Sequence, residues 1–236
     1  MNSAYCVDNE EAFLEYVITK ATQRPSLKGL WDEPAWHEMP VAKLSHFLAQ
    51  SKSRHSRVEV KAVYQDHGLF VFFRVFDKYV RCVQTEYQAG VCTDSCVEFF
   101  AEPKPGRGYF NFEINCGGTL LLYYCDGKGY RDVKLNFNPV PWEFGRQVTI
   151  YHSLPKVVDP EIEVDTEWRI EYFIPFTLFE HYFGPWGPIP GQVWRANFYK
   201  CADKTSHPHW ITWVPLGAEF NFHVPQYFAP IRFQEK

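Results

Sequence analysis

The sequence predicts an all-β fold, an antiparallel immunoglobulin-like or jelly-roll-type β-sandwich with short peripheral helices. The 236-residue chain holds 21 Phe, 14 Tyr and 8 Trp together with 17 Pro, a composition typical of strands and turns. Val58 to Val63 alternates between residue types, and the turn cluster Gln65-Asp66-His67-Gly68 separates it from the apolar run 69–76, which predicts a hairpin. Further short strand patterns follow, divided by Gly, Pro or Asp clusters, and many such strands favour a sandwich.

The remaining elements follow from local patterns. The other expected strands are Cys96 to Ala101, Tyr109 to Cys116, Thr119 to Tyr124, Gln147 to His152, Trp168 to Ile174 and Val193 to Tyr199. Short helices are expected over Glu10 to Leu14, capped by Asn9, and over Pro175 to Phe183. We expect an N-terminal extension with a first strand over residues 1–26, and one sandwich domain over residues 27–236.

The net charge and the N-terminal sequence indicate which partners and which location to expect. The net charge of −4 and the pI near 6.1 provide no basic field, so neither nucleic acid nor a membrane surface is expected as a partner. The acidic N-terminus lacks the basic and apolar regions of a secretory signal, which predicts a cytoplasmic location, or secretion if a signal has been removed.

The seven cysteines are odd in number, contain no Cys-x-x-Cys pair and lie among apolar neighbours, which predicts reduced, buried thiols. A zinc site would need a tetrahedral cluster, for which Cys92 and Cys96 alone give little support.

Strand parity indicates a polar sheet face. In the strand from Tyr109, the side chains of Asn111, Glu113 and Asn115 share the face opposite the apolar residues. The same parity pairs Arg195 with Asn197, and Arg169 with Glu171. If these strands are neighbours, their amides, carboxylates and guanidinium groups form an array suited to a neutral polyhydroxylated ligand such as a sugar. The alternative is an ordinary solvated face with cross-strand ion pairs.

Two other patterns could bind metal. The ladder Asp159, Glu161, Glu163, Asp165 could ligate calcium, although a solvated edge explains it better because no glycine or asparagine supplies the bends of a dedicated loop. His207 and His209 flank Pro208 and could face one ion, but no third ligand is evident, which favours histidines in a turn.

Common catalytic motifs are absent: the sequence has no Gly-x-Ser-x-Gly, His-Glu-x-x-His, Walker or Gly-x-Gly-x-x-Gly pattern. Glu98 and Glu113 could still form a glycosidase pair, whose geometry the sequence does not give.

An ordered series of motifs over about residues 27–233 resembles the family 9 carbohydrate-binding modules. The matching stretches are Leu27-Lys28-Gly29, Ala35-Trp36, Val63 to Val71, Thr93 to Phe100, Tyr109 to Asn115, Trp168 to Pro175, Trp194 to Phe198, Trp210 to Pro215 and Phe222 to Phe228. The resemblance implies a distorted immunoglobulin-like sandwich that binds sugar chain ends, often with structural calcium but with no required cofactor.

The resemblance also implies positions for the site. Family members clamp a sugar between two tryptophans and hold its hydroxyls with Glu, Arg and Asn. Glu98 and Asn115 stand at the family's carboxylate and asparagine, whereas Val91 replaces the first tryptophan, Glu113 the arginine and Phe222 the second tryptophan. Trp36, Trp168 and Trp194 are expected in the core. The predicted saccharide-binding residues are Glu98, Glu113, Asn115, Arg195, Phe222 and His223.

We therefore expect a non-catalytic module that binds a saccharide or another polar ligand on a sheet face and aromatic loops. One alternative is a stand-alone hydrolase or lyase acting on a sugar, with Glu98, Glu113, Arg195 or His223 as catalytic groups. A second alternative is a haem-binding sandwich, for which two histidines would have to supply the axial ligands because only Met1 and Met39 offer thioethers.

Overall fold

The computed structural model describes residues 14–127 and 135–234. Its strands are β1 (Tyr16–Lys20), β2 (Ala42–Leu44), β3 (His46–Phe47), β4 (Arg57–Gln65), β5 (Gly68–Asp77), β6 (Val80–Cys82), β7 (Cys96–Glu102), β8 (Tyr109–Asn115), β9 (Leu120–Asp126), β10 (Asn136–Pro139), β11 (Thr149–His152), β12 (Val158–Ile162), β13 (Thr166–Pro175), β14 (Val193–Cys201), β15 (Trp210–Thr212) and β16 (Ala229–Gln234). The helices are α1 (Trp142–Gly145) and α2 (Phe176–Phe183), with 3-10 turns at Val91–Thr93 and Pro225–Tyr227.

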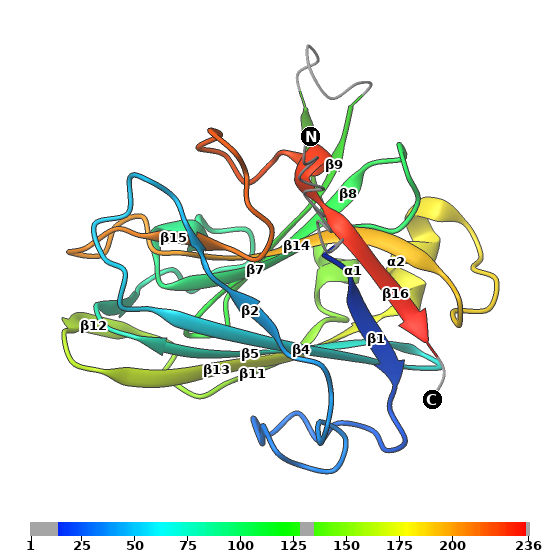
Figure 1. Cartoon of the computed structure of the whole chain (residues 1–236), viewed down its shortest axis with the longest axis horizontal. Helices are drawn as coiled ribbons and strands as arrows, with labels where there is room; N and C mark the ends of the chain where they lie inside the picture. Colours follow the sequence, from blue (N-terminus) through cyan, green and yellow to red (C-terminus); the bar gives the residue numbers. More distant parts are fainter. Residues whose placement is uncertain (1–13, 128–134, 235–236) are drawn as a thin grey trace, which may run out of the picture.

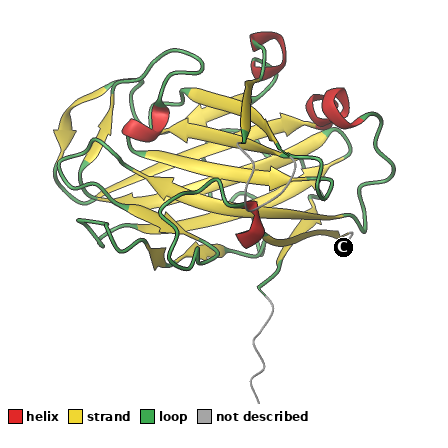
Figure 2. Cartoon of the chain, turned by 90° about the horizontal axis from the view of Figure 1, so that it is seen from above, coloured by secondary structure: helices red, strands yellow, loops and turns green. Residues whose placement is uncertain are grey.

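One sheet curls into two facing layers (Figure 1). Its main path is β10-β9-β8-β7-β14-β16-β1-β4-β5-β13-β11, so β16 and β1 connect the layer built on β7 and β14 to the layer built on β5 and β13. Strands dominate and the helices lie at the periphery (Figure 2). The predicted all-β sandwich is confirmed, with one correction: β1 pairs parallel to both β16 and β4, so the sheet is mixed rather than purely antiparallel.

The expected hairpin is confirmed as β4 and β5, paired from Arg57↔Phe76 to Gln65↔Gly68. The helix expected over Pro175 to Phe183 is α2, and the six other expected strands are β7, β8, β9, β11, β13 and β14. The helix expected over Glu10 to Leu14 falls outside the described residues apart from Leu14. Short strands such as β3, β6 and β15 escaped prediction because two or three residues carry no periodicity.

The core is aromatic and fills the space between the layers. Phe198 of β14 packs against Phe99 of β7 and, across the core, against Phe73 of β5, with ring centroids 5.2 and 5.9 Å apart. Trp36, Trp168 and Trp194 are at most 1% exposed, as expected for structural tryptophans. None of the helices in the described ranges is long and apolar enough to cross a membrane.

A buried charge cluster joins β5 to β14 at one end of the core. Lys200 Nζ lies 2.7 Å from Asp77 Oδ2, and both side chains are inaccessible to solvent. His209 contacts Lys200 and Asp77 and lies 3.1 Å from Ser56 Oγ. Burial opposes ionisation of Asp77, but Lys200 and His209 outweigh it and lower the pKa of the Asp77 carboxyl. His209 thus serves this cluster, while His207 stacks on Tyr79, so the two histidines do not face one ion.

Asp77→Asn should lower the free energy of unfolding by about 3–5 kcal/mol, because it leaves the Lys200 ammonium buried without a counter-charge. The matched control is Asp66→Asn, whose carboxylate is 72% exposed and pairs with Lys20, and which should cost at most about 1 kcal/mol. Chemical denaturation of both variants measures the difference, and equal losses would contradict the role of the buried pair.

Candidate functional site

The outer face of β7, β8 and β14 carries the predicted polar side chains. Glu98 of β7 lies in register with Glu113 of β8 on one side and with Tyr199 of β14 on the other. Strand parity alone would suggest that this face is open to water. In the structure it is not, because every residue of β7 and β8 is buried. Residues of the segments that follow β14 and β15 cover part of it and line a pocket there.

The third strand of the predicted array lies elsewhere. β13 belongs to the opposite layer, so Arg169 and Glu171 do not join the polar face of β8 and β14. Glu171 instead accepts hydrogen bonds from the Gly29 amide at 2.8 Å and from Trp36 Nε1 at 3.0 Å. These bonds hold the segment before β2 against the sheet.

The pocket encloses about 240 Å³. Glu98 and Glu113 come from the sheet, Cys201 and Asp203 from the end of β14 and just beyond it, and Trp210 from the start of β15. The lining residues are Leu48, Cys92, Glu98, Glu113, Cys201, Asp203, Trp210, Phe220, Asn221, Phe222 and His223. It therefore combines three carboxyl groups with aromatic walls.

Each carboxyl group is held through one oxygen. Cys201 Sγ donates to Glu98 Oε1 at 2.9 Å, and Asn111 Nδ2 donates to Glu113 Oε1 at 2.7 Å. Trp210 Nε1 donates to Asp203 Oδ1 at 2.7 Å. Within the described residues, no lysine or arginine forms an ion pair with any of the three carboxyl groups.

Burial without such a partner favours the neutral acids. It raises the pKa of Glu98 well above its usual range, with further contributions from Glu113 and Asp203. Burial likewise raises the pKa of Glu113 to about 7, opposed by the Asn111 hydrogen bond and reinforced by Asp203. The pKa of Asp203 is raised for the same principal reason. Carboxyl groups in such a pocket offer hydrogen-bond donors as well as acceptors.

Aromatic rings form the walls. Phe222 stacks on Tyr199, with centroids 4.2 Å apart and ring planes within 12° of each other. Phe220, half exposed, packs edge-on against Trp210 at 4.9 Å. His223 Nδ1 lies 2.8 Å from the Tyr109 hydroxyl, and burial lowers the pKa of His223 to about 4, so its imidazole is neutral.

The structure brings together four of the six predicted site residues: Glu98, Glu113, Phe222 and His223. Asn115 does not line the pocket. It is fully buried, its Nδ2 donates to Gln84 O and Asp94 Oδ2 at 2.9 Å, and its Oδ1 accepts from the Thr119 amide.

Arg195 also lies outside the pocket. Its Nη1 contacts Glu102 Oε2 at 3.1 Å. Its Nη2 donates to the carbonyls of Pro225, Gln226 and Phe228 at 2.9–3.4 Å. Arg195 thereby ties the C-terminal loop, residues 216–228, to the sheet that it covers.

Sequence reasoning missed Trp210, Asp203 and the two cysteines Cys92 and Cys201 as pocket residues. Trp210 stands in one of the motifs that carried the family resemblance, and Asp203 lies shortly after the expected strand Val193 to Tyr199. Strand parity alone could not place them, because both lie at strand ends or beyond.

The acidic ladder does not gather ligands for calcium. Glu161 accepts hydrogen bonds from the Ser206 amide and hydroxyl. Across residues 14–127 and 135–234, the one group of three metal-ligating side chains within reach of one another is Cys96, Glu98 and Cys201. Structural calcium thus remains an expectation from the resemblance.

The sequence pattern of carbohydrate-binding family 9 matches residues 36–233. The chain belongs to this family. A putative carbohydrate-binding protein from Bacteroides uniformis has 24% identity and a TM-score of 0.81 over 94% of this chain and 100% of its own.

Two structures of a family 9 module from Caldicellulosiruptor kristjanssonii are also similar. The one in complex with cellotriose has 13% identity and a TM-score of 0.63, over 94% of this chain and 95% of its own. The one with glucose has 14% identity and a TM-score of 0.62, over 93% and 96%. No curated protein matches the chain in sequence.

The raised pKa of Glu113 makes stability depend on pH. Because the folded carboxyl keeps its proton up to about pH 7, while the unfolded one loses it near 4.5, the free energy of unfolding should fall as pH rises through this window. Glu113→Gln should reduce that fall by about 1–3 kcal/mol and should be more stable than the parent above pH 7.

Thermal melts from pH 4.5 to 7.5 measure this effect. The control is Glu219→Gln, an exposed carboxylate on the covering loop that should leave the profile unchanged. A Glu113→Gln profile superimposable on that of the parent would show that Glu113 titrates normally.

Proposed function

We propose that this family 9 module binds the end of a neutral saccharide chain in the pocket formed by Glu98, Glu113, Asp203, Trp210 and Phe222. The observation that carries the proposal is the set of three anchored carboxyl groups beside aromatic walls. Family membership supports it, as do the similar modules from Caldicellulosiruptor kristjanssonii, whose structures are complexes with cellotriose and glucose.

The chemistry of the pocket selects a neutral ligand. Sugar hydroxyls donate to carboxylate oxygens and accept from protonated carboxyl groups, so both states of Glu98 and Glu113 are usable. A uronic acid or phosphorylated sugar would bring a negative charge to a pocket whose described lining contains no lysine or arginine to compensate it, which costs free energy. Trp210 and Phe222 supply apolar ring surface for the C–H faces of a pyranose.

The size of the pocket favours a chain end. A volume of about 240 Å³ is below the roughly 300–1,000 Å³ typical of drug-sized ligands. It suits a terminal sugar unit better than an internal segment of a polymer. Binding then depends on a few directional hydrogen bonds rather than on a long aromatic platform.

A second candidate function is hydrolysis, with Glu113 as general acid. A carboxyl group with a pKa near 7 is suited to that role, and Glu98 lies directly across from it in the β7–β8 register. A haem site has less support here, because the pocket is lined by one histidine, His223.

Trp210→Ala should weaken binding of cellotriose at least about tenfold, because aromatic contacts are often the dominant anchors of a binding site. It also releases Asp203 from its hydrogen bond. The matched control is Trp142→Ala, a 59% exposed tryptophan on α1 that does not line this pocket and should leave affinity unchanged.

Calorimetric titration with cellotriose and glucose, preceded by a glycan array to find the preferred sugar, measures the affinity. Chromatography of the incubated sugar tests for products. Equal affinity of parent and Trp210→Ala would place binding elsewhere, and formation of shorter products would favour the hydrolase.

A further inference from the structure

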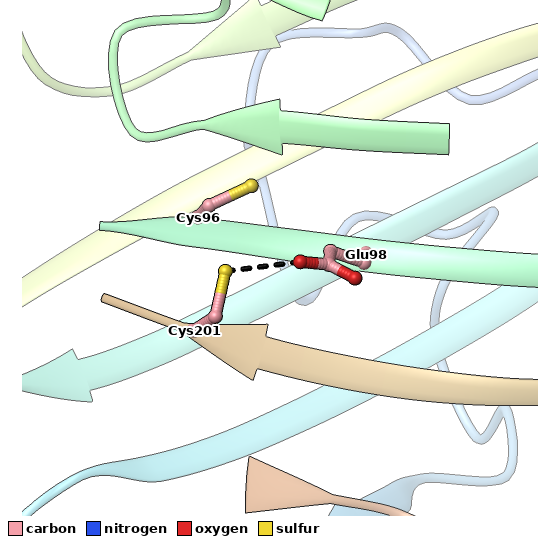
Figure 3. A group of neighbouring side chains, drawn as sticks. All are labelled: Cys96, Glu98 and Cys201. Atoms are coloured by element: carbon pink, nitrogen blue, oxygen red, sulfur yellow. Dashed lines mark hydrogen bonds between the residues drawn. The ribbon is translucent and has the colours of Figure 1, made fainter. Parts of the chain in front are cut away.

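Two thiols and a carboxyl group from β7 and β14 lie close together (Figure 3), and two of the three residues, Glu98 and Cys201, line the pocket. Cys96 and Glu98 lie two residues apart on β7 and therefore share a face, and Cys201 of β14 is the register partner of Cys96. One ligand atom from each of the three lies within 4.8 Å of the other two. All three side chains are at most 2% exposed.

The three side chains of Cys96, Glu98 and Cys201 lie near other acidic and thiol groups. Cys92, Glu113 and Asp203 line the same pocket, so further thiol and carboxyl groups surround the three ligands. Among the described residues that line the pocket there is no arginine or lysine. Buried acids are normally paired with cations or coordinate metals, and this cluster lacks an ion-pair partner in the described part of the chain.

We propose that Cys96, Cys201 and Glu98 bind a zinc ion beside the pocket. Zn²⁺ replaces the thiol protons of Cys96 and Cys201 and the carboxyl proton of Glu98, which pass to solvent, and forms two Zn–S bonds and one Zn–O bond. The two charges of the ion then reduce the −3 of two thiolates and one carboxylate to a local charge of −1.

Zinc fits this donor set better than calcium. Thiolates select zinc and other soft or borderline metals, whereas calcium takes six to eight oxygen ligands. Zn–S bonds of about 2.3 Å and Zn–O bonds of about 2.0–2.2 Å in a tetrahedron separate the ligand atoms by roughly 3.4–3.8 Å, within the span of this trio. A hydrogen bond from Cys201 to Glu98, 2.9 Å long, holds two of the three proposed ligands together.

Glu98 and Cys201 line the pocket and Cys96 does not, so the fourth coordination position of the proposed ion would open toward the pocket. Three protein ligands and one open position are the arrangement of zinc sites that exchange water for a ligand. Zinc binding shares Glu98 with the proposed sugar-binding function but requires no saccharide, so the two can be tested separately.

The test is metal binding by the reduced, chelator-treated protein in the absence of sugar. Co²⁺ serves as the first probe, since cobalt–thiolate bonds absorb in the near ultraviolet, and Zn²⁺ then displaces it. We expect one ion per chain, and Cys96→Ser, Cys201→Ser and Glu98→Gln should each weaken Zn²⁺ binding at least about tenfold. Glu98→Gln keeps the side-chain shape, so it separates loss of a ligand from loss of the fold.

The matched control is Cys82→Ser. Cys82 and Cys116 form the other close pair of thiols in the described residues, away from the pocket. This variant should bind Zn²⁺ like the parent. A folded parent that binds no Zn²⁺, or binding that survives Cys96→Ser and Cys201→Ser, would overturn the inference.

Loss of Zn²⁺ binding in Cys82→Ser would also overturn it, by assigning the ion to the other pair. A parent that binds cellotriose but no Zn²⁺ contradicts this inference alone. One that binds Zn²⁺ but no saccharide contradicts the proposed function alone.

Discussion

The pocket depends on the hydrogen bonds that Arg195 donates to the C-terminal loop. Its guanidinium bridges Glu102 of β7 and three carbonyls of residues 225–228. The fork geometry suits several acceptors at once, and lysine could not reproduce it. By fixing this loop over the polar face of the sheet, Arg195 positions Phe222 and His223 above Glu98 and Glu113 without itself entering the pocket.

Two buried polar clusters in this sandwich differ in whether a cation compensates the buried acids. Asp77 and Lys200 neutralise each other in the core, so their burial is compensated. Glu98, Glu113 and Asp203 form no ion pair with a lysine or arginine of the described ranges, and burial raises the pKa of each. Uncompensated buried acids cost stability and are typical of ligand sites, which supports the proposal that saccharide binds at this end of the sheet.

Much of the fold was predictable because the long strands carry strong periodicity. The alternation of residue types and the turn cluster between them predict β4 and β5. The separation of polar and apolar side chains onto two faces predicts β8. The parallel insertion of β1 between β16 and β4 was not predictable, since it pairs residues more than 200 positions apart. No local pattern encodes such a contact.

The site was predictable only in part, for a related reason. Parity on β8 and the family resemblance led to Glu98, Glu113, Phe222 and His223, which the pocket unites. Strand parity does not show whether a polar face is open to water or covered by other segments. It therefore could not show that Arg195 binds the covering loop. Nor could it show that the side chain of Asn115 is hydrogen-bonded to the turn that follows β8. Trp210 and Asp203 meet only through the tertiary fold.

A crystal structure of the protein with cellotriose tests the central claim most directly. We expect the terminal sugar unit in the pocket, its hydroxyls hydrogen-bonded to Glu98, Glu113 or Asp203 and one ring face against Trp210 or Phe222. A sugar bound on another surface, with this pocket unoccupied, would contradict the account.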